Sequence, residues 1–600
     1  MQTKHFIHDP THLVNSALHS LTLINPSLSF DAENKIIYRR PTRENAVAPK
    51  VSIISGGGSG HEPAFAGFVG KGLLTASVAG TIFASPSAEQ VRRAILSRVP
   101  TQKGVFVITM NYTGDVLNFG MAAEKAKAAG IQTEFFAIGD DAGVGREKGG
   151  KVGRRGIGGG ILVLKMCGAL AELGGSLSEV YNLAQLTTSN IVSVGASLER
   201  VHVPGRPVSD ASPDDQIPRD EIEIGMGIHN EPGSQRRSAS LPELIKIILA
   251  QMLDPSDSDR AFVPISAFDH VVLFINNLGG VSTLEIGGIT AEVHLQLDRD
   301  YHLKPVRVIT GAFLTSLNGM GFSVSILKLT DTNLGPARTM LDLLDSPAEA
   351  IGWAAPIPAS TWNADAETSA EETRDGPIHM QPKNSNLTLN PALTIKILTS
   401  GLKRLIASEA SITHYDTITG DGDCGTGLKR GAEAILSELD TGDALPTDAV
   451  AFVSRIVPVV ENNMDGTSGA LYAIFLNSLV HGLLEQDTET DQGRAVDAVI
   501  WSQALRSSMV ALAKYTPAAP GDRTLMDALV PFVEELGRSG NFRAAARKAE
   551  EGAESTKGMK AKLGRSVYVG GEEEWVGKIP DPGAWGLKEL LAGMAEAMEA

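Results

Sequence analysis

Three aspartates stand within eight positions of the segment HYDTITGDGDCGTG, at Asp416, Asp421 and Asp423. Carboxylates this close repel one another unless a cation lies between them, and hard oxygen ligands suit Mg²⁺ or Ca²⁺. The alternating acidic residues and the distal glutamate of an EF-hand calcium loop are missing. The segment therefore predicts a magnesium site, with a solvated acidic turn as the structural alternative.

Further segments of this half could hold phosphate oxygens. Thr467, Ser468 and Gly469 open an expected helix, so their hydroxyls and N–H groups would lie at its positive end. An ordinary N-cap is the simpler interpretation of the same residues. Three other glycine-containing segments stand at expected helix boundaries: PGDRTLMDAL from Pro520, GRSVYVG from Gly564 and DPGA from Asp581.

In the first half of the chain, two histidines and an aspartate follow glycine-rich strand ends. GGGSGHEP presents His61, NYTGDVLNFG presents Asp115, and GMGIHNEPG presents His229. Consecutive glycines let backbone N–H groups approach a ligand closely. Such an aspartate is often only a helix cap, and an isolated histidine is usually structural. Two similar histidine turns in glycine settings favour a ligand site.

Two segments match known phosphate-binding motifs only in part. GGGSG lacks the third glycine of the dinucleotide-binding fingerprint, which argues against a nicotinamide cofactor. GREKGGKV, residues 145–152, ends in Val152 where a P-loop needs serine or threonine. It is interpreted as a glycine-rich basic loop.

The elements that position these residues change in type along the chain. Up to about residue 345, short β-branched runs such as VSIIS and VFVIT alternate with helical patterns. Further strand candidates from Glu221 onward suggest a second subdomain. Open α/β sheets bind ligands at the carboxyl ends of their strands. Residues 1–345 are therefore predicted to form an α/β, substrate-binding half with two α/β subdomains.

The second half has a different character. Residues 346–386 are rich in Pro, Ala, Ser, Thr and acidic residues without sustained periodicity, which predicts an interdomain linker. Residues 387–600 carry amphipathic helical patterns almost without strands, and the periodicity indicates about eight helices. This part is predicted to be an all-α domain.

Composition limits the function classes. The 600 residues carry a formal charge of −17 and no basic cluster with interleaved aromatics, which argues against nucleic acid and anionic membrane partners. The sequence shows no signal-peptide core, and no apolar run is expected to approach a membrane span of about 20 residues. Cys167 and Cys424 alone do not indicate a disulfide framework. A cytoplasmic protein is expected.

Long segments, in order, resemble one enzyme family. SGGGSGHEPAFAGFVGKG, NYTGDVLNFGMAAEKA, GREKGGKVGRRGIGGG, GMGIHNEPG, NNLGGVSTLE and TSLNGMGFSVSIL are similar to the substrate-binding domain of dihydroxyacetone kinases. HYDTITGDGDCGTG, MDGTSGALY, PGDRTLMDAL, GRSVYVG and DPGA resemble the nucleotide-binding domain of the same kinases, an eight-helix barrel. The resemblance covers nearly the whole chain except the linker.

The resemblance implies roles in the first half. His229 would bind the carbonyl of a small triose covalently as a hemiaminal, Asp115 would be the general base, and His61 would hydrogen-bond the substrate. Gly58, Ser59 and Gly60 would shape the pocket. Many relatives carry lysine where this chain has Met110, which removes a cationic donor.

The resemblance also implies ligands in the second half. Asp416, Asp421 and Asp423 would hold two Mg²⁺ ions that bridge the ATP phosphates. The nucleotide would be bound by residues at the expected helix starts: Cys424, Gly425, Thr426, Gly427, Thr467, Ser468, Thr524, Leu525, Asp581, Pro582 and Gly583. Asp465 replaces a glycine found in many relatives.

The expected activity is ATP-dependent phosphorylation of dihydroxyacetone, with glyceraldehyde as a second substrate and a homodimer as the assembly. Both halves are fused without a phosphotransfer domain, so free ATP is the expected donor. One alternative is an additional activity on the same fold, cyclising cleavage of FAD. Another is a dihydroxyacetone-sensing regulator, which the presence of His229, Asp115 and all three aspartates disfavours.

Overall fold

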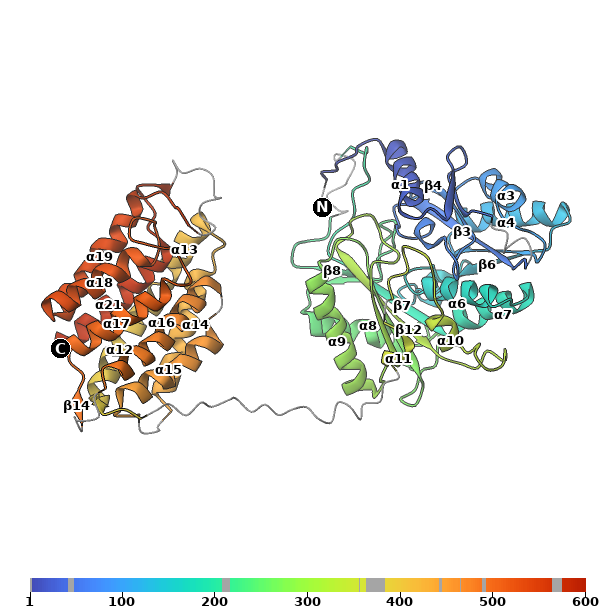
Figure 1. Cartoon of the computed structure of the whole chain (residues 1–600). Helices are drawn as coiled ribbons and strands as arrows, with labels where there is room; N and C mark the ends of the chain where they lie inside the picture. The colour runs from blue at the N-terminus through green and yellow to red at the C-terminus, as the bar shows by residue number, and fades with distance from the viewer. Residues whose placement is uncertain are drawn as a thin grey trace. The chain divides into compact units, whose positions relative to one another are not determined.

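The computed structural model describes residues 3–41, 48–207, 216–355, 357–362, 384–441, 445–464, 466–487, 493–563 and 575–599. The chain divides into two compact units, Met1–Glu372 and Thr373–Ala600 (Figure 1). Strands occur mainly in the first unit and helices dominate the second. The predicted fold class, an α/β half followed by a helical half, is confirmed.

The first sheet of the N-terminal unit has six strands. Their order is β1 (Leu28–Asp31), β2 (Ile36–Arg39), β4 (Ala76–Ile82), β3 (Ser52–Ser59), β5 (Val105–Met110) and β6 (Thr133–Ile138). The pairs β4–β3, β3–β5 and β5–β6 are parallel, and the two pairs that join β1, β2 and β4 are antiparallel. All six residues of β5 are buried, as expected for a parallel strand covered on both faces.

The second sheet also has six strands. Their order is β11 (Arg307–Gly311), β10 (Val271–Asn277), β12 (Gly321–Lys328), β7 (Ile191–Ser197), β8 (Ile222–Ile224) and β9 (Gln235–Arg237). Only β10 and β11 are parallel. The two sheets are the two α/β subdomains that the sequence predicts.

Helices cover both faces of these sheets. α6 (Gly160–Glu172) is buried along nearly its whole length in one apolar cluster with residues of both sheets, such as Phe106 and Phe274. A separate cluster joins the first sheet to α3 (Ala88–Ser97) and α4 (Thr113–Ala128). Another joins the second sheet to α8 (Leu241–Leu253) and α9 (Thr283–Tyr301). The other helices among the described residues of this unit are α1 (Pro10–Ile24), η1 (Ala66–Phe68), α5 (Arg146–Gly149), α7 (Leu177–Ser189), α10 (Met340–Asp345) and α11 (Ala359–Trp362).

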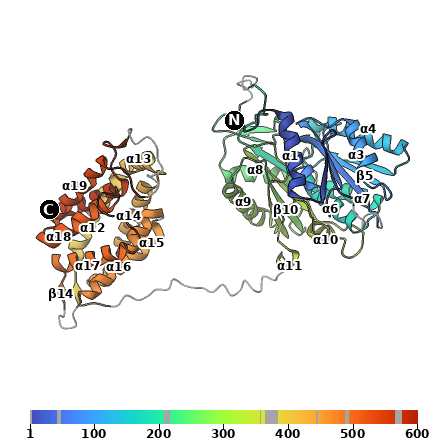
Figure 2. The same cartoon turned by 45° about the horizontal axis from the view of Figure 1, so that its top comes forward.

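In the described residues of the C-terminal unit, eight helices form a closed ring of pairwise contacts, and Figures 1 and 2 show this unit as a bundle of helices. Each helix contacts the next, and the last returns to the first, in the order α12 (Pro391–Ala407), α14 (Cys424–Leu439), α15 (Ala449–Asn463), α16 (Gly466–Glu485), α17 (Ala498–Leu512), α18 (Met526–Ser539), α19 (Phe542–Ser555) and α21 (Pro582–Glu599). A ninth helix, α13 (Glu409–Thr419), follows α12 after Ser408 and packs on α14. The described part of the unit also has a short strand pair, β13 (Leu387–Thr388) with β14 (Arg494–Ala495), and the turn η5 (Thr556–Gly558).

The expectation that no apolar run approaches the length of a membrane span is wrong for α16. Within the described ranges it is the one helix long and apolar enough, by length and composition, to cross a membrane. The physical reason for its composition is its position in the ring. Phe475 packs against the apolar cluster of α17–α19, and Leu479 lies in the cluster shared with α15. A helix that faces two cores needs apolar residues on more than one side.

The predicted linker, residues 346–386, lies partly outside the described residues, at 356 and 363–383. Its first residues pack on the N-terminal unit, because the Gly352 N–H donates to the Gly67 carbonyl at 2.8 Å and Trp353 lies against Phe313. The boundary between the two domains stays a prediction.

Candidate active site

The candidate site of the N-terminal unit begins at the carboxyl ends of two neighbouring strands. β3 and β5 are parallel, so their ends lie at the same edge of the first sheet. His61 follows β3, and Asp115 lies in the first turn of α4, which follows β5. A Cβ added to Gly57 would lie 3.6 Å from Asp115 Oδ2, so the end of β3 runs directly beside this carboxylate.

Residues 315–317 bring the second sheet's histidine to the same place. The Leu317 N–H donates to the Gly60 carbonyl at 2.6 Å, and the Thr315 N–H donates to the His61 carbonyl at 3.1 Å. The Ser316 hydroxyl donates to the Ile228 carbonyl at 2.6 Å. One short segment thus holds the His61 turn and the His229 turn together, although they lie far apart in the sequence.

His61 and His229 contact each other through Nε2 at 3.0 Å. His61 Nδ1 lies 2.8 Å from the Thr315 carbonyl, which can only accept, so Nδ1 carries the proton. Burial, and then the charge of His229, lower the pKa of His61 to about 3, which keeps this ring neutral. His61 Nε2 is therefore the acceptor, and the His229 Nε2–H donates to it.

Asp115 is a buried carboxylate with one oxygen that is unpartnered in the described part of the chain. It is 7% exposed, and Oδ1 has no hydrogen-bond partner among the described residues. Burial raises its pKa to about 6, although a hydrogen bond with Ser85 and the charge of His229 act in the opposite direction. The helix-cap alternative does not apply, because Tyr112 holds the N-cap position of α4 without a side-chain cap. Such a carboxyl group can take up a proton near neutral pH.

The predicted pocket residues Gly58, Ser59 and Gly60 shape the end of β3. A Cβ at Gly58 would lie 2.7 Å from the Ala84 nitrogen, so only glycine fits there. The Ser59 hydroxyl donates to the Gly80 carbonyl at 3.0 Å, and the Gly60 N–H donates to Glu62 Oε2 at 2.9 Å. These two polar groups therefore already have partners within the protein.

The site is also lined by aromatic rings, which the sequence analysis did not single out. Phe83 stacks on His61 with ring centroids 5.2 Å apart, and Tyr112 meets His229 edge-on at 4.7 Å. Phe83 follows β4 in the segment GTIFASPSAEQV, and the sequence motifs assigned no role to this residue. Met110, the departure from many relatives, is buried, and its sulfur lies against Gly160 at the start of α6.

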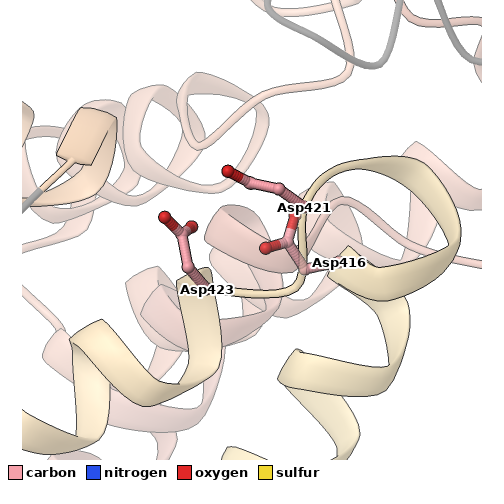
Figure 3. A group of neighbouring side chains, drawn as sticks. All are labelled: Asp416, Asp421 and Asp423. Carbon is pink, nitrogen blue, oxygen red and sulfur yellow. The ribbon is translucent and has the colours of Figure 1, made fainter. Parts of the chain in front are cut away.

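The candidate metal site of the C-terminal unit surrounds the turn between α13 and α14. Asp416 lies in the last turns of α13, Asp421 on the turn, and Asp423 at the start of α14 (Figure 3). One carboxylate oxygen from each residue can be chosen so that all lie within 4.8 Å of one another. Asp416 is buried and the other two are exposed, so the set is open on one side. The donor set fits a hard divalent cation.

Helix N-termini with predicted nucleotide residues gather around these aspartates. The Cys424 N–H at the start of α14 donates to Asp416 Oδ2 at 2.9 Å, and the Cys424 thiol lies 3.6 Å from the Ser468 hydroxyl of α16. A Cβ on Gly466 would lie 3.8 Å from Asp423 Oδ2. The positive ends of α14 and α16 therefore adjoin the carboxylates, which suits polyphosphate.

Asp581 brings the start of α21 to the same region. Its Oδ1 accepts from the Ala584 N–H at 2.7 Å, and burial, aided by the charges of Asp527 and Asp416, raises its pKa to about 6. A Cβ on Gly583 would lie 3.8 Å from the Leu525 Cβ, so α18 begins beside α21.

The other predicted nucleotide residues occupy the same helix starts. Thr426 donates its hydroxyl to the Asp423 carbonyl at 2.8 Å, and Thr524 accepts from the Met526 N–H at 3.2 Å. Gly425 packs on α13, whereas Gly427 has open space around it. Thr467 lies in the first turn of α16 and Pro582 opens α21. Asp465 and GRSVYVG, residues 564–570, lie outside the described residues.

An α/β unit with a histidine pair beside a buried carboxylate, fused to a helical barrel whose helix starts surround three aspartates, has the parts of a phosphoryl-transferring enzyme. Comparisons with known proteins agree. Residues 19–352 match the Dak1 domain and residues 418–596 match the DAK2 domain. The chain belongs to the dihydroxyacetone kinase family, so the predicted family and the predicted enzyme class, a kinase, are confirmed.

Relatives match over the full length. The chain is 42% identical to a dihydroxyacetone kinase of Pichia angusta over 614 residues, covering 100% of this chain and 99% of the relative. It is 33% identical to a triokinase/FMN cyclase of Bos taurus, with coverage of 100% and 99%. A crystal structure of the dihydroxyacetone kinase from C. freundii in complex with AMP-PNP and Mg²⁺ is 30% identical, with a TM-score of 0.62 and coverage of 99% and 100%.

Proposed function

We propose that this protein transfers the γ-phosphoryl group of ATP to dihydroxyacetone and forms dihydroxyacetone phosphate. The observation that carries the proposal is the cluster of His61, Asp115 and His229 at one sheet edge, in a chain that also holds the aspartate cluster of the helical barrel. The relatives named dihydroxyacetone kinases and the relative solved with AMP-PNP and Mg²⁺ support the substrate and the donor.

His229 is proposed to form a hemiaminal with the substrate ketone. The proton on His229 Nε2 passes to His61 Nε2, which lies 3.0 Å away. The freed lone pair bonds to the carbonyl carbon, the C=O π pair moves to oxygen, and that oxygen takes the proton from His61. Glycerol has no carbonyl group, so it offers no electrophile to this step.

Asp115 is proposed to accept the proton of the reacting hydroxyl. Its free Oδ1 and its pKa of about 6 fit a general base near neutral pH. A proton must leave the hydroxyl as the new phosphorus–oxygen bond forms.

Asp416, Asp421 and Asp423 are proposed to hold the Mg²⁺ ions that accompany ATP. When bound, Mg²⁺ neutralises phosphate charge and orients the polyphosphate. The helix starts that carry Cys424, Ser468 and Gly583 would donate N–H groups to the nucleotide phosphates. A protein with a formal charge of −17 needs such local positive potential to bind a polyanion.

Glyceraldehyde phosphorylation and cyclising cleavage of FAD are proposed as second activities. Both rest on the relative named triokinase/FMN cyclase, which matches over the full chain. The dihydroxyacetone-sensing regulator is the other alternative and predicts binding without turnover. A homodimer working in the cytoplasm is proposed from the family resemblance, and sedimentation velocity would test the assembly.

The test compares ATP consumption with dihydroxyacetone, glyceraldehyde and glycerol, together with intact-protein mass spectrometry of the adduct. We expect turnover with dihydroxyacetone, none with glycerol, and a protein–triose adduct that His229→Ala abolishes. Binding of dihydroxyacetone without ATP consumption would favour the regulator. An undiminished adduct in His229→Ala would remove this residue from the mechanism.

A further inference from the structure

Glu231 holds His229 at two points. Its Oε1 accepts from His229 Nδ1 at 2.9 Å, and its Oε2 accepts from the His229 backbone N–H at 2.9 Å. One carboxylate thus fixes both the ring and the backbone of the same residue. The imidazole faces Glu231 with Nδ1 and His61 with Nε2, so each ring nitrogen has a different partner.

Glu231 is itself held in place by its surroundings. A Cβ on Gly227 would lie 2.1 Å from Glu231 Oε2 and 2.5 Å from Arg155 Nη1, so the carboxylate and the guanidinium occupy the space that a side chain at residue 227 would need. Arg155 is anchored by Asp141, whose Oδ2 accepts from Nε at 2.9 Å and from Nη2 at 2.7 Å. The carboxylate of Glu231 therefore stands beside an immobilised cation.

The charge of Glu231 persists at working pH. Burial by itself raises its pKa, but the hydrogen bonds and the charge of His229 outweigh burial and lower the pKa to about 2. Burial by itself lowers the pKa of Arg155. The charge of Asp141, with a smaller contribution from the charge of Glu231, outweighs burial, so the pKa of Arg155 is raised. An ionised carboxylate only accepts hydrogen bonds, so the proton between it and the ring stays on His229 Nδ1.

We infer that Glu231 is the positioning residue of the covalent step, an inference that rests on the proposed function. A neutral imidazole has two tautomers, and only the nitrogen without a proton can attack a carbonyl carbon. By keeping the proton on Nδ1, Glu231 makes Nε2 the nitrogen that becomes reactive once its own proton has passed to His61 Nε2. Once Nε2 is bonded to carbon with Nδ1 still protonated, the ring carries a positive charge that the Glu231 carboxylate stabilises.

Glu231→Gln tests this inference, with Glu223→Gln as the matched control. Glu223 is 2% exposed and supports the same segment, because it accepts from the Gly233 N–H at 2.7 Å and from Arg236 Nε at 3.0 Å. These two hydrogen bonds hold the loop, and neither involves the imidazole of His229. Both variants make the same chemical change, and only Glu231→Gln removes the charge beside His229 Nδ1.

The readouts are adduct fraction by intact-protein mass spectrometry against dihydroxyacetone concentration, and KM and kcat for dihydroxyacetone in the full chain. For Glu231→Gln we expect the concentration at half-maximal adduct and the KM to rise roughly 10- to 100-fold, the scale of a lost charge-assisted hydrogen bond. The kcat at saturating substrate should stay close to that of the parent, because Asp115 and the reacting hydroxyl are untouched. Glu223→Gln should change these values little.

Several outcomes overturn the inference. An adduct curve for Glu231→Gln that matches the parent would show that the carboxylate does not position the ring. Equal losses in both variants, or a fall in kcat as large as the fall in kcat/KM, would indicate general loosening of the loop. Failure of the parent itself to form an adduct would overturn the covalent step of the proposed function and this inference with it. An unchanged melting transition of the N-terminal unit in calorimetry verifies that each variant is folded.

Discussion

Replacing Asp115 by asparagine should stabilise the N-terminal unit while stopping turnover. The folded environment raises the pKa of this carboxyl from 3.8 to about 6 because burial penalises the charge. A shift of about two pKa units corresponds to about 3 kcal/mol at a pH where the group is ionised. Since Oδ1 has no partner, asparagine loses no hydrogen bond there. A buried amide group with imperfect partners costs part of the gain, which leaves about 1–3 kcal/mol.

The sign of the pH dependence follows from the raised pKa. Between pH 3.8 and about 6 the folded state binds more protons at this site than the unfolded state does. The contribution of Asp115 to stability therefore falls as pH rises through this window, and the full penalty is present above it. The advantage of Asp115→Asn should be largest above pH 6 and should disappear near pH 4.

Differential scanning calorimetry at several pH values measures this difference. Dihydroxyacetone identifies the transition of the N-terminal unit, because a ligand raises the melting temperature of the unit that binds it. At roughly 2 °C per kcal/mol for a unit of this size, the expected rise is about 2–6 °C at neutral pH. Kinetics should show that turnover is lost while triose binding remains.

Asp140→Asn is the matched control. Burial also raises the pKa of Asp140 to about 6, but its carboxylate accepts from the Ile157 N–H at 2.7 Å and from the Ser193 hydroxyl at 2.5 Å. Asparagine has only one side-chain oxygen and cannot accept both of these hydrogen bonds, so this variant should destabilise the unit. If Asp115→Asn also destabilised it, or kept wild-type turnover, the reasoning about an unpartnered buried base would be refuted.

Three further predictions follow from the two sites. Turnover should fall as pH drops below about 6, because protonated Asp115 no longer accepts the hydroxyl proton, and a pH–rate profile that stays flat to pH 5 would contradict this role. Asp421→Ala or Asp423→Ala should abolish Mg-ATP binding while the triose adduct persists, which separate calorimetric titrations decide; normal Mg-ATP affinity would reject the metal assignment. Gly227→Ala should weaken adduct formation, because its Cβ would lie 2.1 Å from Glu231 Oε2; mass spectrometry measures the adduct, and an undiminished adduct would contradict this prediction.

The aspartate cluster could be predicted from the sequence because its geometry is local. The three residues lie on one helix end, one turn and the next helix start, so their spacing alone brings the carboxylates together. The two sheets could be predicted in the same way, from strand patterns with their glycine-rich ends. The closed ring follows from helix contacts between distant segments, such as α12 with α21, so only the family resemblance, and no local pattern, predicted it.

The contact between His61 and His229 could not be derived locally. It depends on residues 315–317, which bond to both histidine turns through backbone groups that leave no signal in the residue types. Glu231 stood in the motif IHNEPG, two positions after the histidine, yet its role depends on the space left by Gly227 and on Arg155. Periodicity likewise did not show that α16 faces two apolar cores.

The carboxylates of the two units lie in opposite environments, one buried and the other largely exposed, and this difference matches the two tasks of a kinase. Burial of Asp115 outweighs the opposing hydrogen bond with Ser85 and the charge of His229, so its basicity rises until it can take a proton near neutral pH. Asp421 and Asp423 are exposed beside Asp416, in an open set that a divalent cation can enter with its water and phosphate ligands. A cation next to Asp115 would lower its basicity, and burial of the aspartate cluster would hinder exchange of a charged nucleotide. Placing the proposed base and the proposed metal ligands in separate units would let each carboxylate environment serve one step without weakening the other.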